Sequence, residues 1–305
     1  MKISIMITTY NLEKYIEKAL DSVLNQKTEH EYEILIGDDG STDNTVSIIR
    51  DYQRKYPNKI LLFVMPRIQD KQYDKIARAS QNRLNLWAHA TGEYCSFLDG
   101  DDYYTDELRL DKMAAILDDP ANKDCVMCAH NLELTYESGE ESVPLVRAVK
   151  THKFRIRDYW PLIFIQANAL MFRNVYKDMV KDEYINDTFD DNLITFRLFK
   201  YGNMFYLPDI MGAYRQLQGS SWNERNVQKQ MRVNLDELWL EKKIFPEAFE
   251  YSITRHYKEL SYYAKHTDLI DADEYADILS IYPDSVKSYF LAKLKRALMK
   301  LIRMY

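Results

Sequence analysis

Apolar positions in the first hundred residues follow two spacings, one typical of buried strands and one typical of amphipathic helices. Ile3 to Thr8, Tyr32 to Ile36 and Ile60 to Met65 are short apolar runs, which favour strands of a parallel sheet. Between the first two runs, Glu13 to Gln26 carries apolar residues at the 3.6-residue spacing of a helix. A second helix is predicted to start near Ser41 or Thr42, either of which can cap it. This order predicts a doubly wound α/β sheet, which binds ligands at the carboxyl ends of its strands.

The alternation of strands and helices continues to about Gly219 and then gives way to long helical patterns. We therefore expect one domain over residues 1–222 and a helical C-terminal region over 223–305. The remaining elements expected in the first domain are strands at 94–98, 126–129, 204–207 and 211–215, helices at 84–90, 106–117 and 190–199, an apolar segment at 164–172, and a loop or hairpin tip at 137–142.

Composition narrows the class of protein. The chain has 305 residues, 46% of them hydrophobic and 29% charged, which is typical of a soluble protein. The net charge of −6 argues against a general nucleic-acid binder. The sequence contains no run of eighteen apolar residues, so no transmembrane helix is predicted. The apolar stretch from Ile3 to Ile7 is too short for a signal peptide. Three cysteines make no disulfide framework, so we expect a cytoplasmic protein.

An acidic turn follows the predicted strand at 94–98. Asp99, Gly100, Asp101 and Asp102 place three carboxylates in four positions, and the glycine allows a sharp turn. Carboxylates this close raise one another's pKa values unless a cation neutralises them. Mg²⁺ or Mn²⁺ suits such oxygen ligands and takes the rest of its shell from water and substrate phosphates. The alternative is a solvated acidic turn.

A second acidic pair, Asp38 and Asp39, follows the second predicted strand. Either carboxylate can accept from a nucleobase N–H or from ribose hydroxyls, while Asp101 can hold a cation on a diphosphate. The sequence has neither a GxGxxG after its first strand nor a GxxxxGK[ST] motif, which disfavours a dinucleotide-binding domain and a P-loop. These features together favour a nucleoside-diphosphate substrate.

A series of short motifs resembles the family-2 glycosyltransferases of the GT-A fold, and most of all those that build bacterial surface polysaccharides. The motifs occur in family order over residues 1–222. They are Thr8-Thr9-Tyr10-Asn11, Ser22-Val23-Leu24-Asn25-Gln26, Asp38-Asp39-Gly40-Ser41-Thr42-Asp43-Asn44-Thr45, Ala90-Thr91-Gly92-Glu93-Tyr94, Phe97-Leu98-Asp99-Gly100-Asp101-Asp102-Tyr103, Asp190-Asp191 with Gly202, Ala213-Tyr214-Arg215 and Ser220-Ser221.

The resemblance implies a role for each matched position. Asp101 would bind the metal, with Asp99 near the ribose and the metal's waters, and the metal would offset charge on the leaving diphosphate. Asp191 would be the general base that deprotonates the acceptor hydroxyl for an inverting attack, with Asp190 as the fallback. The nucleotide-sugar pocket would be formed by Thr8, Tyr10 stacking on the base, Asn11, Asp38, Asp39, Arg83 facing the diphosphate, Asp99, Gly100 and Arg215.

One position departs from the family pattern. Leu217 stands where the family commonly has a histidine, two residues after Arg215. If that histidine contacts the metal or the diphosphate in the family, another residue takes its place here, and the nearest candidates are Arg215, Ser220, Ser221 and Trp222.

Several other residues have both a structural and a functional interpretation. Cys125 and Cys128 lack a second pair for a zinc site, so core packing is favoured, and His130 is expected to pack in the same way. Trp160 can stack on an acceptor sugar or pack internally. Lys71, Lys75 and Arg78 form either a basic loop over the diphosphate or a solvated face.

The end of the chain is basic and amphipathic. After Asp284 there is no acidic residue, and leucines recur on one face from Leu291 to Leu301. Such a helix over 287–305 fits an anionic membrane surface, as an acceptor on a polyprenyl diphosphate at the inner face would require. The alternative is docking on the catalytic domain or on a second protomer. The basic residues are Lys287, Lys293, Lys295, Arg296, Lys300 and Arg303.

The main hypothesis is a metal-dependent, hexosyl-type inverting glycosyltransferase that uses a nucleotide-diphosphate sugar, with UDP as the default nucleotide. A second hypothesis, motivated by Leu217, is a catalytically silent sugar-nucleotide-binding partner of another transferase. A third is a nucleotidyltransferase, although Thr9-Tyr10-Asn11 lacks the basic loop that such enzymes carry after strand one.

Overall fold

The computed structural model describes residues 2–67, 75–147, 150–159, 165–186, 188–217 and 226–302. By packing, the chain divides into two units, which we describe separately: residues 1–153 with 165–218, and residues 154–164 with 219–305. The described part of the segment 154–164, residues 154–159, thus belongs to the same unit as the C-terminal helices. The division into domains at residue 222 stays a prediction.

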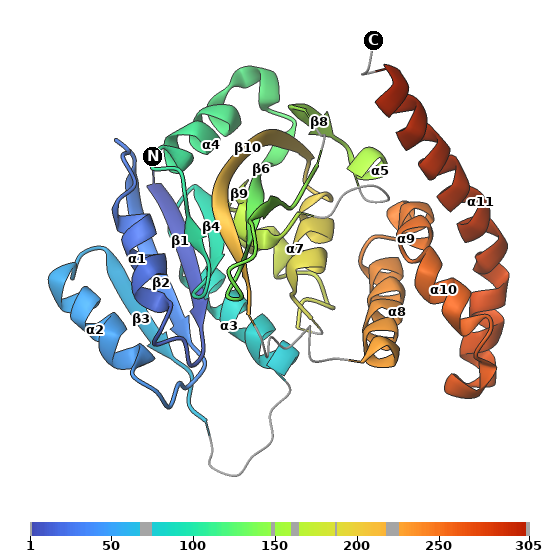
Figure 1. The fold of residues 1–305 in the computed structure, drawn as a ribbon, viewed down its shortest axis with the longest axis horizontal. Coiled ribbons are helices and arrows are strands. Elements are labelled where there is room, and N and C mark those ends of the chain that lie inside the picture. Colours follow the sequence, from blue (N-terminus) through green and yellow to red (C-terminus); the bar gives the residue numbers. More distant parts are fainter. Residues whose placement is uncertain are drawn as a thin grey trace. The chain divides into compact units, whose positions relative to one another are not determined.

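The first unit is built on one mixed sheet with the strand order β3-β2-β1-β4-β9-β6-β10-β5 (Figure 1). β1 to β4 are mutually parallel, β9 is antiparallel to both β4 and β6, and β10 runs parallel to β6. The doubly wound mixed sheet is confirmed. The strands are β1 (Lys2–Thr9), β2 (Glu31–Asp38), β3 (Ile60–Val64), β4 (Tyr94–Asp99), β5 (Tyr103–Tyr104), β6 (Cys125–Tyr136), β7 (Val143–Pro144), β8 (His152–Phe154), β9 (Leu170–Arg173) and β10 (Asn203–Gln216).

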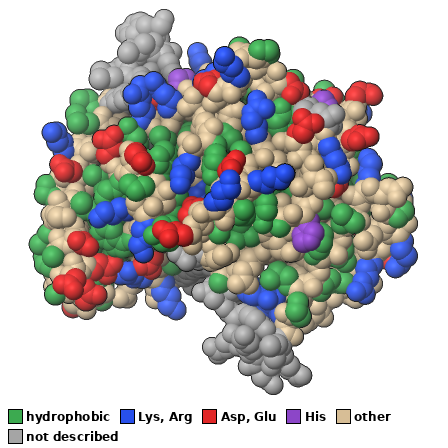
Figure 2. Space-filling view, turned by 180° about the vertical axis from the view of Figure 1, so that it is seen from behind, with side chains coloured by type: hydrophobic (Ala, Val, Ile, Leu, Met, Phe, Trp, Pro, Cys, Tyr) green, Lys and Arg blue, Asp and Glu red, His purple; other side chains and the backbone are tan. Residues whose placement is uncertain are grey.

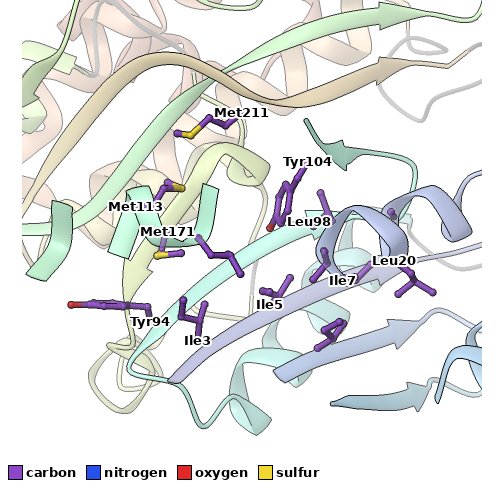
Figure 3. Close-up of a cluster of buried hydrophobic side chains, with 14 of the residues drawn as sticks. Ile3, Ile5, Ile7, Leu20, Tyr94, Leu98, Tyr104, Met113, Met171 and Met211 are labelled. Atoms are coloured by element: carbon purple, nitrogen blue, oxygen red, sulfur yellow. The ribbon is translucent and has the colours of Figure 1, made fainter. Parts of the chain in front are cut away.

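Helices cover both faces of this sheet. On one face, Ile3, Ile5 and Ile7 of β1 pack with residues of α1, α2 and α4 in a continuous apolar core (Figure 3). On the other face, Trp87 of α3 packs edge-on against Phe97 and Phe172. The helices of this unit are α1 (Ile16–Leu24), α2 (Thr45–Lys55), α3 (Lys75–His89), α4 (Arg109–Asp118), η1 (Pro120–Asn122), η2 (Ala167–Ala169), α6 (Tyr176–Met179) and α7 (Asp191–Leu198).

Three sequence-based details differ from the structure. Neither Ser41 nor Thr42 caps α2: the N-cap is Asn44, and Asp43 accepts from the Thr45 amide at 3.0 Å. The two short strands expected at 204–207 and 211–215 are a single strand, because β10 continues through register shifts on either side of Ile210. Within the described residues 165–172 of the expected apolar segment, a strand begins only at Leu170, with β9 (Leu170–Arg173).

The second unit is helical. Its core consists of Leu235, Leu238, Ile253, Leu260, Tyr263 and Ile278. Within the described residues, no helix is long and apolar enough to cross a membrane. Its helices are α5 (Ile156–Tyr159), α8 (Val227–Ile244), η3 (Pro246–Ala248), α9 (Phe249–Arg255), α10 (Tyr257–Tyr263), η4 (Thr267–Leu269) and α11 (Ala272–Ile302).

Candidate active site

The predicted site residues gather where the parallel strands end. Thr9 of β1 is in register with Asp38 of β2, and Thr8 is in register with Asp99 of β4. The Thr8 hydroxyl donates to Asp99 Oδ1 at 2.7 Å. The chain leaves β1 for β2 on one side and returns to β4 on the other, so this edge is a topological switch point, where open α/β sheets bind ligands.

Asp38 and Asn11 organise the loops at this edge. The Asp38 carboxylate is fully buried and accepts from the amides of Gly40 and Ser41 at 2.9 and 2.8 Å, as well as from the Ser41 hydroxyl. Asn11, which has a positive φ of 53°, accepts from the Thr42 amide at 2.8 Å. Both residues were predicted to contact the nucleotide sugar. In the structure their side chains make these internal hydrogen bonds, and a contact with the nucleotide sugar stays a prediction.

Asp39 lies between two arginines. Its carboxylate pairs with Arg78 of α3 and with Arg67, and the Arg67 guanidinium lies 4.1 Å from the ring centroid of Tyr10. Arg78 was predicted to belong to a basic loop or a solvated face, but it is a largely buried partner of Asp39. Lys71 lies outside the described residues, as does the side chain of Lys75. Tyr10 is half-exposed, and one face of its ring packs against the Arg67 guanidinium.

Arg83 links the two halves of the site. Its Nη2 lies 3.1 Å from Asp99 Oδ1 of β4 and 3.1 Å from Asp191 Oδ1 at the start of α7. Burial opposes the charge on Arg83, but Asp99 and Asp191 raise the pKa of the guanidinium above its ordinary value. The resemblance implied that Arg83 faces the diphosphate. In the structure its carboxylate partners are Asp99 and Asp191, and a contact with the diphosphate stays a prediction.

The neighbouring aspartates of α7 have different roles. Asp190 is the N-cap, and its carboxylate accepts from the Leu193 amide at 3.0 Å. Asp191 forms an ion pair with Arg83. Its Oδ1 is buried and accepts no hydrogen bond from the described residues. Burial raises the pKa of Asp191 to about 7, with Arg83 opposing the shift and Asp99 and Asp190 adding to it. A carboxylate that titrates near neutrality can accept a proton from a hydroxyl group.

The carboxylates of the acidic turn differ in their surroundings. Asp102 is buried and accepts from the Arg215 amide at 2.8 Å and from the Asn168 side chain, and burial with the charges of Asp101 and Asp99 raises its pKa well above the ordinary value. Burial and the charge of Asp99 raise the pKa of Asp101 to about 6. Gly100 allows the turn to pass beneath β1, since a Cβ there would meet the Thr8 carbonyl at 3.0 Å.

The carboxylates of Asp101 and Asp99 fit a divalent cation that takes its other ligands from water and a bound phosphate. No group of three His, Cys, Asp or Glu side chains that could hold a metal occurs in the part of the chain that the structure describes. Mg²⁺ and Mn²⁺ commonly use one or two carboxylates, with water and phosphate oxygens completing the shell. Asp101 and Asp99 supply that number, and a cation would relieve the repulsion that raises the pKa of Asp101.

Arg215 supports the turn. Its guanidinium donates to the Asp101 carbonyl and lies 4.7 Å and 5.1 Å from the ring centroids of Tyr103 and Tyr15. It was predicted to contact the nucleotide sugar, and these contacts hold it beside the turn. The other three candidates to replace the missing histidine, Ser220, Ser221 and Trp222, lie outside the described residues, as does Trp160.

Residues without a catalytic expectation fall in the core. Cys125 and Cys128 are buried and free, as the strand pattern predicts. His130 is buried too; burial and the neighbouring Arg109 lower its pKa well below the ordinary value.

Charged side chains of both signs are interspersed on the face in Figure 2.

Sequence reasoning missed Gln166 and Asn168, two buried amides beside the acidic turn and Asp191. The available signal was two polar residues inside the apolar run at 164–172.

Comparisons with known proteins agree on the family. A model described as glycosyl transferase family 2 matches residues 4–180. An uncharacterized protein of Mycobacterium tuberculosis is 30% identical over 222 residues, which are 72% of this chain and 60% of that protein. The chain therefore spans about three fifths of that relative's length. A poly(ribitol-phosphate) beta-glucosyltransferase of Bacillus spizizenii is 39% identical over 111 residues, 36% of this chain and 16% of that enzyme.

Solved structures share the fold. TarS 1–349 of S. aureus in complex with UDP-GlcNAc superposes with a TM-score of 0.57 and 19% identity, covering 93% of this chain and 92% of that one. A mannosyltransferase, PcManGT, from Pyrobaculum calidifontis in complex with GDP-Man and Mn²⁺ gives a TM-score of 0.50 and 15% identity, covering 97% and 86%. Because the family model matches more than half of the chain, the chain belongs to glycosyl transferase family 2, and its sheet has the GT-A fold.

Proposed function

We propose that this chain is an inverting glycosyltransferase of the hexosyl type. It transfers a sugar from a nucleotide-diphosphate sugar, by default a UDP-sugar, to a hydroxyl group of a glycan or lipid-linked acceptor in surface-polysaccharide assembly. The names of relatives support this context: one is a poly(ribitol-phosphate) beta-glucosyltransferase, and one structural neighbour binds UDP-GlcNAc.

The observation that carries the proposal is the position of Asp191. Its carboxylate is held opposite Asp99 by Arg83, and its raised pKa suits a general base. Asp191 takes the proton of the acceptor hydroxyl while the acceptor oxygen bonds to the anomeric carbon. The bond from that carbon to the diphosphate oxygen breaks, and the nucleoside diphosphate leaves with the electron pair. Attack from the side opposite the leaving group inverts the configuration.

The donor is held at the other end of the site. The nucleobase stacks on Tyr10 beside Asp39, and Thr8 and Asp99 lie on the ribose side. Arg67 lies over Tyr10 in this structure, so base stacking on that face requires Arg67 to move. Asp101 and Asp99 would hold Mg²⁺ or Mn²⁺, which when bound supplies positive charge for the leaving diphosphate.

The end of α11 serves membrane attachment in this proposal. Phe290, Leu291 and Leu294 are more than half exposed and lie at helical spacing. No acidic residue occurs after Asp284, while six basic residues follow it, so the segment 287–305 is complementary to anionic lipid. The test is co-sedimentation with phosphatidylglycerol vesicles. Loss of binding in Leu291→Ser/Leu294→Ser is expected, and equal binding to phosphatidylcholine vesicles would oppose the proposal.

The decisive experiment combines binding and turnover. A thermal-shift screen of nucleotide sugars with and without Mn²⁺ identifies the donor, and release of nucleoside diphosphate from that donor measures transfer. Turnover by wild type but not by Asp191→Asn supports the transferase. Donor binding without turnover supports the silent binding partner instead, and pyrophosphate release from a nucleoside triphosphate and a sugar phosphate supports a nucleotidyltransferase.

A further inference from the structure

The loops that follow β1 and β2 are joined by hydrogen bonds at the carboxyl edge of the sheet. Three successive backbone amides of the first loop donate to side chains of the second loop. The donors are the amides of Asn11, Leu12 and Glu13, and the acceptors are, in that order, Ser41 Oγ at 2.8 Å, Thr45 Oγ1 at 2.7 Å and Asp43 Oδ2 at 3.1 Å. These bonds satisfy the amides of the first loop and fix it against the second.

Hydrogen bonds also run in the opposite direction. The Thr42 amide donates to Asn11 Oδ1 at 2.8 Å, and the Asn44 amide donates to Glu13 Oε2 at 3.0 Å. The Asn44 side chain adds a second bond to the same Glu13 oxygen at 2.9 Å. Each loop thus supplies acceptors for backbone amides of the other, so a displacement of either loop breaks bonds made by both.

The reciprocal bonds coincide with a strained backbone. Asn11 has a φ of 53°, in the left-handed region that costs free energy for residues other than glycine. A residue keeps such a conformation where its surroundings over-determine it, and both the amide and the side chain of Asn11 are bonded to the second loop. Because Tyr10 directly precedes Asn11, these bonds set the course of the chain at Tyr10, where it leaves β1.

The second loop is in turn anchored beside Asp39. The Ser41 amide and hydroxyl both donate to the carboxylate of the preceding Asp38, at 2.8 Å and 2.5 Å. The Ser41 hydroxyl therefore connects Asp38 on one side with the Asn11 amide on the other. Through these bonds the position of Tyr10 is tied to that of Asp39.

We propose that Ser41, Asp43 and Thr45 are positioning residues that hold Tyr10 where a nucleobase stacks on it beside Asp39. The three side chains act on the base only through the backbone of the first loop and touch no ligand themselves. Thr45 fits this role because it is fully buried, and the Ser41 hydroxyl fits because it both accepts and donates within the protein. This inference rests on the proposed function only for the nucleobase on Tyr10.

Arg67 is the other contact of the Tyr10 ring. Its guanidinium lies 4.1 Å from the ring centroid and donates from Nε to the Asp39 carbonyl at 2.5 Å. In the proposed function Arg67 moves away from the stacking face when the base binds, so this contact is lost. The bonds to Ser41 and Thr45 remain, and they hold Tyr10 in the donor complex.

The test is a double-mutant cycle between the second loop and Tyr10, read as the Kd for UDP by calorimetry. Ser41→Ala/Thr45→Val removes two acceptors of backbone amides and should raise the Kd about tenfold, no more than Tyr10→Ala raises it. Added to Tyr10→Ala, the same two substitutions should change the Kd less than about twofold, because no ring remains to be positioned. An unchanged Kd in Ser41→Ala/Thr45→Val, or equal losses with and without the Tyr10 ring, would overturn the inference.

Ser4→Ala is the matched control, near the start of β1 and away from the carboxyl edge of the sheet. The Ser4 hydroxyl accepts from the Gly92 amide at 2.8 Å and donates to Glu33 of β2 at 2.7 Å. Its partners, an amide and a β2 carboxylate, are of the same kind as those of the Ser41 hydroxyl. Ser4→Ala should lower the free energy of unfolding in urea at least as much as Ser41→Ala does, and keep the wild-type Kd. Equal increases in Kd in the two single variants would assign the effect to general destabilisation and overturn the inference.

A second measurement needs no nucleotide. The NMR order parameter of the Tyr10 amide is expected to be about 0.85, the value of rigid backbone, in the wild type and in Ser4→Ala. It should fall below about 0.6 in Ser41→Ala/Thr45→Val. If it falls while the wild type binds no UDP, the inference stands and the proposed function fails. An order parameter that stays at the wild-type value in Ser41→Ala/Thr45→Val overturns the inference, whether or not UDP binds.

Discussion

Arg83 of α3 lies 3.1 Å from Asp191, the second residue of an acidic pair more than a hundred positions along the chain. The same guanidinium group contacts Asp99 at 3.1 Å, so one buried cation connects the end of β4 with the start of α7. This buried ion pair connects the acidic turn that follows β4 with the first turn of α7.

Asp191→Asn should abolish transfer while leaving donor binding intact, because the amide cannot take the acceptor's proton. Release of nucleoside diphosphate and calorimetric binding of UDP measure the two effects. Asp190→Asn is the matched control, since Asp190 caps α7 and asparagine caps equally well. Transfer by Asp191→Asn at the wild-type rate would remove Asp191 from the base role.

Transfer should rise with pH through about 7. A general base acts in its ionised form, and burial raises the pKa of Asp191 to about 7, so the base is mostly protonated at pH 6 and mostly ionised at pH 8. The measurement is kcat between pH 5.5 and 8.5 at saturating donor. A flat profile over this range would contradict the assignment.

The sequence predicts the ends of β2 and β4 well, because the acidic motifs at 38–39 and 99–102 each follow a short apolar run that is typical of a buried strand. Thr8, Asp39 and Asp99 could therefore be placed at one edge without coordinates. The pairing of Arg67 and Arg78 with Asp39 could not be predicted, because it depends on how the chain returns after β3. Local sequence patterns do not predict contacts between residues this far apart in the chain.

Long-range contacts also explain why the sequence did not predict the continuous strand β10 or the hydrogen bonds of Gln166 and Asn168. Pro208 and Asp209 are typical of a break between strands, yet β10 runs through them, because parallel pairing with β6 on both sides outweighs the local preference. Gln166 and Asn168 lie inside the segment 164–172 that was expected to be apolar, and the pattern gives no indication of the hydrogen bonds that they make.

Arg83→Met should destabilise the fold by about 3 kcal/mol at pH 8, because Asp99 and Asp191 are left without their buried counter-charge. The loss should be smaller at pH 5. Without the arginine the folded-state pKa of Asp191 rises further above its unfolded value, so the native state binds more protons and loses stability as pH increases. Urea unfolding at both pH values measures this, and Arg83→Lys, which keeps the charge, should cost less. Equal losses at pH 5 and pH 8 would contradict it.

Tyr10→Ala should weaken UDP binding by 10- to 100-fold, since stacking of a base on an aromatic ring is worth about 1–3 kcal/mol. Tyr10→Phe keeps the ring and should bind UDP as the wild type does. Because Tyr10 is 40% exposed, both variants are expected to fold normally, which thermal unfolding checks. Unchanged calorimetric affinity in Tyr10→Ala would place the base elsewhere.

Asp101→Asn should have opposite effects on stability and on donor binding. Burial and the charge of Asp99 raise the pKa of Asp101 to about 6, so its ionised form is unfavourable in the folded protein without a cation. Removing that charge should stabilise the metal-free protein by about 1 kcal/mol at pH 8, after allowance for solvent screening, and leave stability nearly unchanged below pH 4. The same substitution should abolish the increase in UDP affinity that Mn²⁺ produces in the wild type, because the ion loses its carboxylate ligand. Urea unfolding and calorimetry with and without Mn²⁺ measure the two effects, and Asp106→Asn, which removes an aspartate paired with Lys112 outside the site, is the control. If Asp101→Asn destabilised the metal-free protein and kept the Mn²⁺ effect, Asp101 would be a structural residue like Asp102 rather than a metal ligand.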